Sequence, residues 1–172
     1  EDEIIRECEK IYSSNVDIVE LRCDFFDHVL NIEKVCDLLS KIKMILNEKP
    51  LIFTVRSKEE GGEICLSEKE YMDLYKNICE KKLTDIIDVE LRIGEAKIAE
   101  LVKVAHKNNI KVIISKHDFE KTPQKNEMIE DLINMQKLNA DIPKLAVMPN
   151  TYIDVIKLLE VTTIMKEKYK ET

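Results

Sequence analysis

Five short apolar runs, rich in β-branched residues, recur along this chain of 172 residues and start 26 to 35 residues apart. They are Val16–Leu21, Leu51–Val55, Ile86–Leu91, Val112–Ser115 and Leu145–Met148. Runs of this length with little alternation are typical of strands buried on both faces of a parallel sheet. The spacing leaves room for one helix between successive strands. The sequence therefore predicts an α/β fold.

The segments between the runs have helical periodicity. Apolar stripes at helical spacing are formed by Tyr71, Leu74, Tyr75 and Ile78, and again by Ile98, Leu101, Val102 and Ala105. Ser67 and Glu70 form a capping box, and Thr122-Pro123 is interpreted as an N-cap followed by proline at the first helical position. Further helices are expected at about 2–13, 32–46, 125–139 and 151–168. The predicted order is one helix followed by five strand-helix units.

Two architectures contain such repeats: an open doubly wound sheet and a closed (β/α)8 barrel. The chain has only three glycines and no glycine-rich nucleotide motif after any strand, which weakens the first alternative. Polar residues gather where the apolar runs end, as they do in barrels. Because a full barrel takes ~250 residues, we expect residues 1–172 to form a single α/β barrel domain, incomplete at both ends, with about five parallel strands and six helices.

Composition narrows the classes of function. A net charge of −7 argues against a dedicated nucleic-acid binder, which needs a basic face. Five scattered cysteines, without CxxC spacing, give no support to disulfides or a zinc site and favour a reducing, cytoplasmic setting. No apolar run approaches the ~20 residues of a membrane span, and no signal peptide is visible. The sequence leaves the oligomeric state open, a homodimer included.

Lys144 and His117 are the most informative polar residues. Lys144 lies in the apolar run Pro-Lys-Leu-Ala-Val-Met-Pro, and His117 follows the run Val-Ile-Ile-Ser. Their separation of 27 residues is about one repeat, which predicts neighbouring strands. An amine in a buried strand beside an imidazole suggests Schiff-base chemistry with an acid/base partner. The alternatives are a structural histidine, and a lysine at the first strand position with its amine directed outward.

Other polar residues also end the runs. Glu20, Arg22 and Asp24 share one face of the first strand, either as an ion-pair network or as contacts to a polar ligand. Arg56 ends the second run and can bind a hydroxyl or carboxylate in a fixed geometry.

Asp88 and Glu90 share one face of the third run, where they could form salt bridges to Arg22 or Arg56. Gly61-Gly62 is interpreted as a turn rather than an anion site. His28 and His106 are expected at the surface.

Five segments together resemble the type I 3-dehydroquinate dehydratases, in family order and across essentially the whole chain. They are Val-Glu20-Leu-Arg22-Cys-Asp24, Phe-Thr-Val-Arg56-Ser-Lys-Glu-Glu60-Gly-Gly-Glu, Asp-Ile-Ile-Asp88-Val-Glu90-Leu, Ile-Ile-Ser-Lys-His117-Asp-Phe and Pro-Lys144-Leu-Ala-Val-Met-Pro. The resemblance implies a (β/α)8 barrel that converts 3-dehydroquinate to 3-dehydroshikimate in the shikimate pathway, without a metal or organic cofactor.

The resemblance also implies a role for each residue. Lys144 would form an imine with the substrate ketone, His117 would be the general acid/base, and Glu60 would orient that histidine. Contacts to the substrate would come from Glu20, Arg22 and Arg56, with support behind them from Asp24, Asp88 and Glu90. Family members also have a first strand and two further strand-helix units that are not in this sequence. Two alternatives stay open: another class I Schiff-base aldolase or lyase, and a catalytically inactive fragment of the dehydratase.

Overall fold

The computed structural model describes residues 1–169. Its five strands are β1 (Val19–Arg22), β2 (Leu51–Thr54), β3 (Ile86–Glu90), β4 (Lys111–Asp118) and β5 (Ile142–Val147). The six α-helices are α1 (Asp2–Tyr12), α2 (Ile32–Leu46), α3 (Glu68–Glu80), α4 (Glu95–Lys107), α5 (Lys125–Lys137) and α6 (Tyr152–Lys168). These elements confirm the prediction of five strands and six helices in this part of the chain.

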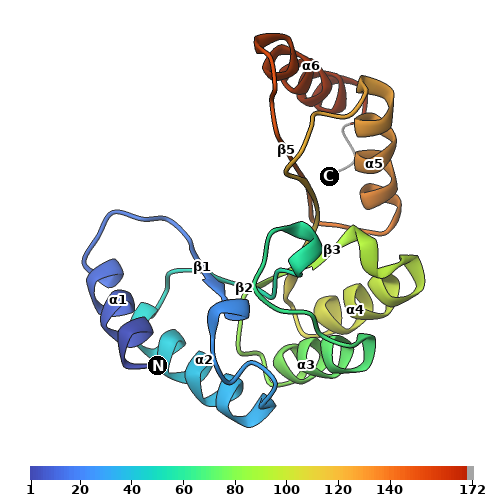
Figure 1. Ribbon diagram of the computed structural model, residues 1–172. Coiled ribbons are helices and arrows are strands. Elements are labelled where there is room, and N and C mark those ends of the chain that lie inside the picture. The colour runs from blue at the N-terminus through green and yellow to red at the C-terminus, as the bar shows by residue number, and fades with distance from the viewer. Residues whose placement is uncertain (170–172) are drawn as a thin grey trace.

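All the strand pairs are parallel, and each strand lies next to the one before it, in the order β1-β2-β3-β4-β5. In a doubly wound sheet the strand order reverses at one point. No such reversal occurs among these five strands. The helices follow one another along the outside of the curved sheet (Figure 1). Sequential parallel winding of this kind is the arrangement of a (β/α)8 barrel. Within residues 1–169 the sheet is not closed, because β1 and β5 each pair on one side only.

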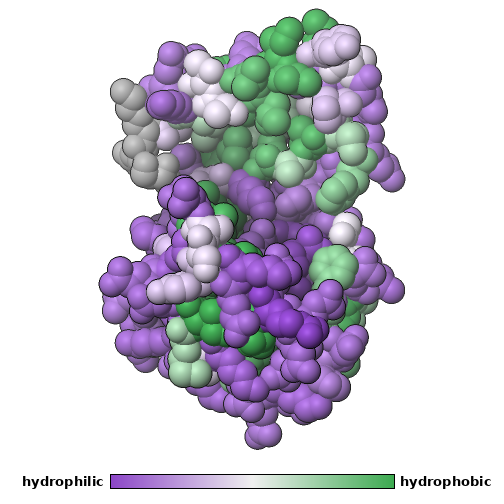
Figure 2. Space-filling view, turned by 90° about the vertical axis from the view of Figure 1, so that its left-hand side faces the viewer, coloured by the Kyte–Doolittle hydropathy of each residue, from purple (hydrophilic) through white to green (hydrophobic). Residues whose placement is uncertain are grey.

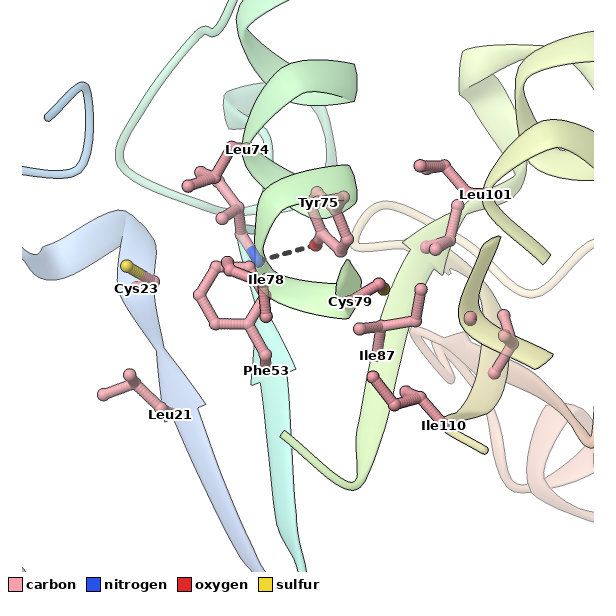
Figure 3. Packing of buried hydrophobic residues seen from close by; sticks show 14 of the residues in the cluster. Leu21, Cys23, Phe53, Leu74, Tyr75, Ile78, Cys79, Ile87, Leu101 and Ile110 are labelled. Atoms are coloured by element: carbon pink, nitrogen blue, oxygen red, sulfur yellow. Dashed lines mark hydrogen bonds between the residues drawn. The ribbon is translucent and has the colours of Figure 1, made fainter. Parts of the chain in front are cut away.

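The core lies between the sheet and the helices outside it, and helices α2 to α4 supply most of its helical residues. Phe53 of β2 and Ile87 of β3 are fully buried against Tyr75, Ile78 and other residues of α3 (Figure 3). The Tyr75 hydroxyl accepts a hydrogen bond from Val55 N (3.0 Å) and donates one to Asp88 O (2.7 Å). A single core side chain thus joins α3 to the ends of both β2 and β3. This contact fixes where the polar residues after β2 lie relative to those on β3.

Helix starts follow local chemistry. Ser67 and Glu70 form the predicted capping box of α3. The expected cap at Thr122-Pro123 is wrong, since α5 begins at Lys125 and Glu127 accepts from the Gln124 backbone N–H (3.2 Å). Thr122 instead donates its hydroxyl to Met148 O (2.8 Å), which ties this loop to the segment after β5.

Strand boundaries differ from the prediction at both ends of the chain. Residues 16–18 precede β1 rather than belonging to it, and Val16 and Ile18 are exposed. β5 begins at Ile142, so Lys144 is its third residue and not its first.

The expectation that β5 is buried on both faces is also wrong, because it is only partly covered. A groove of about 760 Å³ runs beside this strand, lined by Leu145, Leu158 and Met165 among others. Among residues 1–169, β5 pairs with β4 alone, which also suits Pro143, a residue without an N–H to donate.

Hydrophobic side chains are unevenly exposed. Figure 2 shows them gathered over the end of the molecule that carries α5, β5 and α6, while the opposite end is mostly hydrophilic. The exposed apolar residues of α6 are Tyr152, Ile153, Val155, Ile156 and Leu159. No helix among residues 1–169 is long and apolar enough to cross a membrane.

Candidate active site

A buried cluster of charges lies at the carboxyl ends of β2, β3 and β4, with Arg56 at its centre. The Arg56 guanidinium donates to Asp88 (2.9 Å), to Glu90 (3.3 Å) and to the Ser115 hydroxyl (2.9 Å). Burial alone would lower the pKa of Arg56, but the charges of Asp88 and Glu90 outweigh it and raise the pKa above its ordinary value. Of the two predicted salt-bridge partners for these carboxylates, Arg56 is the one observed.

Asp88 connects this cluster to Lys144. Its carboxylate is fully buried and accepts from Lys144 Nζ (3.1 Å), from Arg56 and from the Ser115 hydroxyl. Burial alone would raise the pKa of Asp88, but the positive charges of Arg56 and Lys144 and the Ser115 hydroxyl hold it below its usual range. Asp88 is therefore an anion that fixes the Lys144 amine, whose side chain is 36% exposed. The amine is accessible as well as anchored.

His117 is held by Glu60. The imidazole Nδ1 lies 2.8 Å from Glu60 Oε2, and the His117 backbone N–H donates to the same oxygen (3.2 Å). An ionised carboxylate only accepts hydrogen bonds, so Nδ1 carries the proton in this pair. In a neutral imidazole Nε2 then keeps its lone pair and is the basic atom. Both side chains are largely buried, at 10% and 6% exposed.

A tight turn places Glu60. Gly61 follows it with φ +79°, in the left-handed region, which confirms the interpretation of Gly61-Gly62 as a turn. A Cβ on Gly62 would lie 1.9 Å from Arg56 O, so this backbone approach excludes any side chain there. The turn therefore returns the chain against Arg56 and directs Glu60 toward β4.

The strand register explains why His117 and Lys144 belong to one site. β4 and β5 are neighbours, with Ser115 opposite Lys144 and His117 opposite Ala146. This confirms the predicted adjacency of the two strands. His117 and Ser115 are two residues apart on β4 and so share a face with Lys144 and Asp88. A cleft of about 340 Å³, lined by Glu59, Glu60, Leu91, Arg92, Lys116 and His117, opens beside the histidine.

The predicted residues of β1 form a second group. Arg22 donates to both oxygens of Asp24 (2.8 and 2.7 Å), and Asp24 also accepts from the Arg56 backbone N–H (3.2 Å). Burial alone would raise the pKa of Asp24, but Arg22 and the Arg56 backbone amide lower it overall. Glu20 accepts from the Thr54 hydroxyl (2.6 Å). In the part of the chain that the structure describes, the hydrogen bond from the Arg56 backbone N–H to Asp24 is what links this group directly to the central cluster.

Two residues of the site were missed at the level of sequence, Ser115 and Thr54. Each hydroxyl is fully buried and bonded to a predicted site residue. Ser115 could have been predicted as a site residue from the sequence, because it is the one polar residue in its apolar run and lies two positions before His117.

As expected, His28 and His106 are exposed, and His106 Nε2 pairs with Asp141 (2.8 Å). Among residues 1–169, no group of three His, Cys, Asp or Glu side chains could hold a metal ion.

Comparison with known proteins is consistent with this arrangement. The family model for type I 3-dehydroquinase matches residues 1–172. The chain belongs to the type I 3-dehydroquinase family. It is 53% identical to the 3-dehydroquinate dehydratase of Clostridium botulinum over 167 residues, 97% of this chain and 66% of that protein. With the Clostridioides difficile enzyme the identity is 46% over 169 residues, 98% of this chain and 66% of that protein.

Solved structures of the family share the fold. A crystal structure of the C. difficile type I dehydratase, with covalently modified comenic acid, superposes with a TM-score of 0.96 over 98% of this chain and 66% of that one, at 46% identity. The Aquifex aeolicus dehydratase gives 0.80 over 94% of this chain and 69% of that one, at 31% identity. The predicted fold class is thereby confirmed. The chain spans about two thirds of the length of these relatives.

Proposed function

We propose that this chain carries the catalytic residues of a type I dehydratase that converts 3-dehydroquinate to 3-dehydroshikimate through an imine on Lys144. The observation that carries the proposal is the pair of anchored groups on neighbouring strands. Lys144 is held by Asp88, and His117 is held by Glu60 with Nε2 left as the basic atom. Family membership supplies the substrate, because the relatives are named for it.

The first stage is imine formation. Lys144 gives one proton to His117 Nε2, and the lone pair of the neutral amine attacks the ketone carbon. A proton passes from the attacking nitrogen to the new alkoxide to give the carbinolamine. His117 then returns its proton to the carbinolamine hydroxyl, which leaves as water and leaves a protonated imine. Asp88 lies 3.1 Å from Nζ, so its negative charge stabilises the cation as it develops. Its other bonds, to Arg56 and Ser115, fix its position before the reaction and avoid reorganisation during it.

The second stage is elimination. The protonated imine draws electrons from the adjacent carbon, and His117 Nε2 removes the proton there to leave an enamine. The enamine electrons return and expel the hydroxyl as water, with a proton given back by His117. Hydrolysis of the remaining imine releases the conjugated product and restores Lys144. Glu60 stabilises the imidazolium that exists between the two proton transfers, through its bond to Nδ1.

Substrate contacts are part of the same proposal. Arg22 keeps 34% of its side chain exposed and presents its guanidinium at the end of β1 near Glu20, so these two residues are offered as contacts to substrate hydroxyls. Both terminal nitrogens of Arg56 already donate to protein oxygens. The bonds to Asp88, Glu90 and Ser115 use three of the five N–H donors of Arg56, so a substrate contact would use one of the others. Asp24 and Glu90 hold these arginines in place.

The test is direct turnover of 3-dehydroquinate, followed by the absorbance of the conjugated product. Lys144→Met should abolish turnover, because no amine remains to form the imine. Lys43→Met is the matched control, since Lys43 lies on α2 outside the cleft beside His117, has a similar exposure of 30% and is also paired with an aspartate, Asp85 (2.8 Å). Turnover that survives Lys144→Met, or is lost equally in both variants, would contradict the proposal.

A further inference from the structure

Phe119 lies just past the end of β4, and its ring packs against the turn that follows Glu60. A Cβ added to Gly61 would lie 2.5 Å from Cε2 of this ring and 2.7 Å from its Cζ. The edge of the ring therefore occupies the space that a side chain at position 61 would need. Gly61 suits this contact because it has no side chain and tolerates its φ of +79°. The ring and the glycine thus form one close contact between the end of β4 and the turn.

The Phe119 ring also lies beside the imidazole of His117. The two rings are nearly parallel, with 11° between their planes and 6.2 Å between their centroids. Aromatic rings at this separation interact as an offset stack. One residue, Asp118, separates the two in the sequence, so both side chains point to the same face of the chain. Phe119 is therefore placed to hold the imidazole and the turn together.

The bond between Glu60 and His117 depends on this turn. A single oxygen, Glu60 Oε2, accepts the His117 backbone N–H (3.2 Å) and lies 2.8 Å from Nδ1. Glu60 is the last residue of a single turn of 3-10 helix, Lys58–Glu60, and Gly61 follows it directly. A shift of Gly61 would therefore shift the Glu60 backbone and move the carboxylate away from Nδ1. The contact with Phe119 restricts that shift.

We propose that Phe119 is a positioning residue, which keeps the Glu60 carboxylate on Nδ1 of His117 through its contact with Gly61. Once the carboxylate leaves, either nitrogen of the neutral imidazole can carry the proton. A proton on Nε2 takes away the lone pair that acts as the base. The effect on turnover rests on the proposed function, whereas the location of the His117 proton does not.

The experiment locates the His117 proton by NMR. Proton–nitrogen correlation spectra of the whole chain, isotope-labelled at histidine, are recorded at a pH where the imidazole is neutral, and His117→Gln identifies the His117 signals by their loss. In the wild type, the shifts of the two ring nitrogens should be far apart, because Nδ1 alone carries the proton. In Phe119→Ala the two shifts should converge, because the proton is then shared between Nδ1 and Nε2.

Two further variants show whether the effect belongs to the Phe119 ring. Phe119→Leu keeps an apolar side chain at this place and should give a smaller convergence than Phe119→Ala. Tyr152→Ala removes an aromatic side chain that is 91% exposed on α6, so it should leave the shifts unchanged. Because Phe119 is itself 57% exposed, Phe119→Ala should stay folded. Unchanged shifts in Phe119→Ala, or an equal convergence in Tyr152→Ala, would overturn the proposal.

Turnover of 3-dehydroquinate gives a second measurement. In Phe119→Ala, kcat should fall about 2- to 10-fold while KM stays near the wild-type value, because only molecules with a free Nε2 lone pair can remove the substrate proton. A raised KM with unchanged nitrogen shifts would show that Phe119 contacts the substrate instead, and would overturn its positioning role. Converged shifts in this variant, together with a wild type that shows no turnover, would contradict the dehydratase proposal but support the role of Phe119.

Discussion

The hydroxyl of Tyr75 should be worth far more to stability than that of its neighbour Tyr71. The two rings are buried and stacked, with centroids 4.4 Å apart. The Tyr75 hydroxyl bonds both Val55 N and Asp88 O, whereas the Tyr71 hydroxyl has no partner. Tyr75→Phe therefore leaves a buried donor and a buried acceptor without this partner. At about 1–3 kcal/mol for each group, the expected loss is about 3 kcal/mol of unfolding free energy.

Urea denaturation of the wild type and both variants measures this difference. A loss of about 3 kcal/mol corresponds to a fall in Tm of about 6–12 °C for a domain of this size. Tyr71→Phe removes a buried hydroxyl without a hydrogen-bond partner among the described residues, so its unfolding free energy should not fall and should rise by about 1 kcal/mol or more. The m-values must agree for the comparison to hold. Equal losses in the two variants, or a loss near zero for Tyr75→Phe, would show that the two hydrogen bonds of the Tyr75 hydroxyl do not stabilise the fold.

Two further predictions concern the site. His117→Ala should lower kcat by ~10² or more, because the general acid/base is lost. Borohydride with 3-dehydroquinate should still label this variant, because Lys144 remains. A near-normal kcat would show that His117 has no part in the mechanism. The pKa of Asp24 is lower in the folded state than in the unfolded chain, where it is about 3.9. The Asp24 carboxylate therefore stabilises the fold above the unfolded pKa. This stabilisation is lost as the pH falls through the folded pKa. The gap in unfolding free energy between wild type and Asp24→Asn should therefore narrow below about pH 4, and a constant gap from pH 7 to 3 would show that the Asp24 charge is not involved.

Local patterns were enough to predict the fold. Apolar runs gave all five strands of the described chain, and the capping box at Ser67 gave the start of α3. Errors arose where a neighbour distant in sequence decides the outcome. The partial exposure of β5 depends on its position at the edge of the sheet, and the role of Thr122 depends on Met148. Neither dependence is visible in the local sequence.

The candidate site was predicted in part for the same reason. Spacing alone indicated that Lys144 and His117 lie on adjacent strands, and the register confirms it. The ion-pair partners of Asp88 could not be assigned from the sequence, which offered Arg22 and Arg56 as candidates. In the structure Asp88 pairs with Arg56 and also with Lys144. The bond between His117 and Glu60 spans 57 residues and was expected from the family resemblance, not from spacing.

Chemical trapping can show whether Lys144 forms an imine with the substrate. Sodium borohydride is added to the protein with 3-dehydroquinate, and the modified residue is located by peptide mass spectrometry. One reduced adduct, on Lys144, is expected, because its amine is anchored by Asp88 on the strand beside His117. The adduct should be absent without substrate. A substrate-dependent adduct on any other lysine, with Lys144 unmodified, would show that Lys144 does not form the imine.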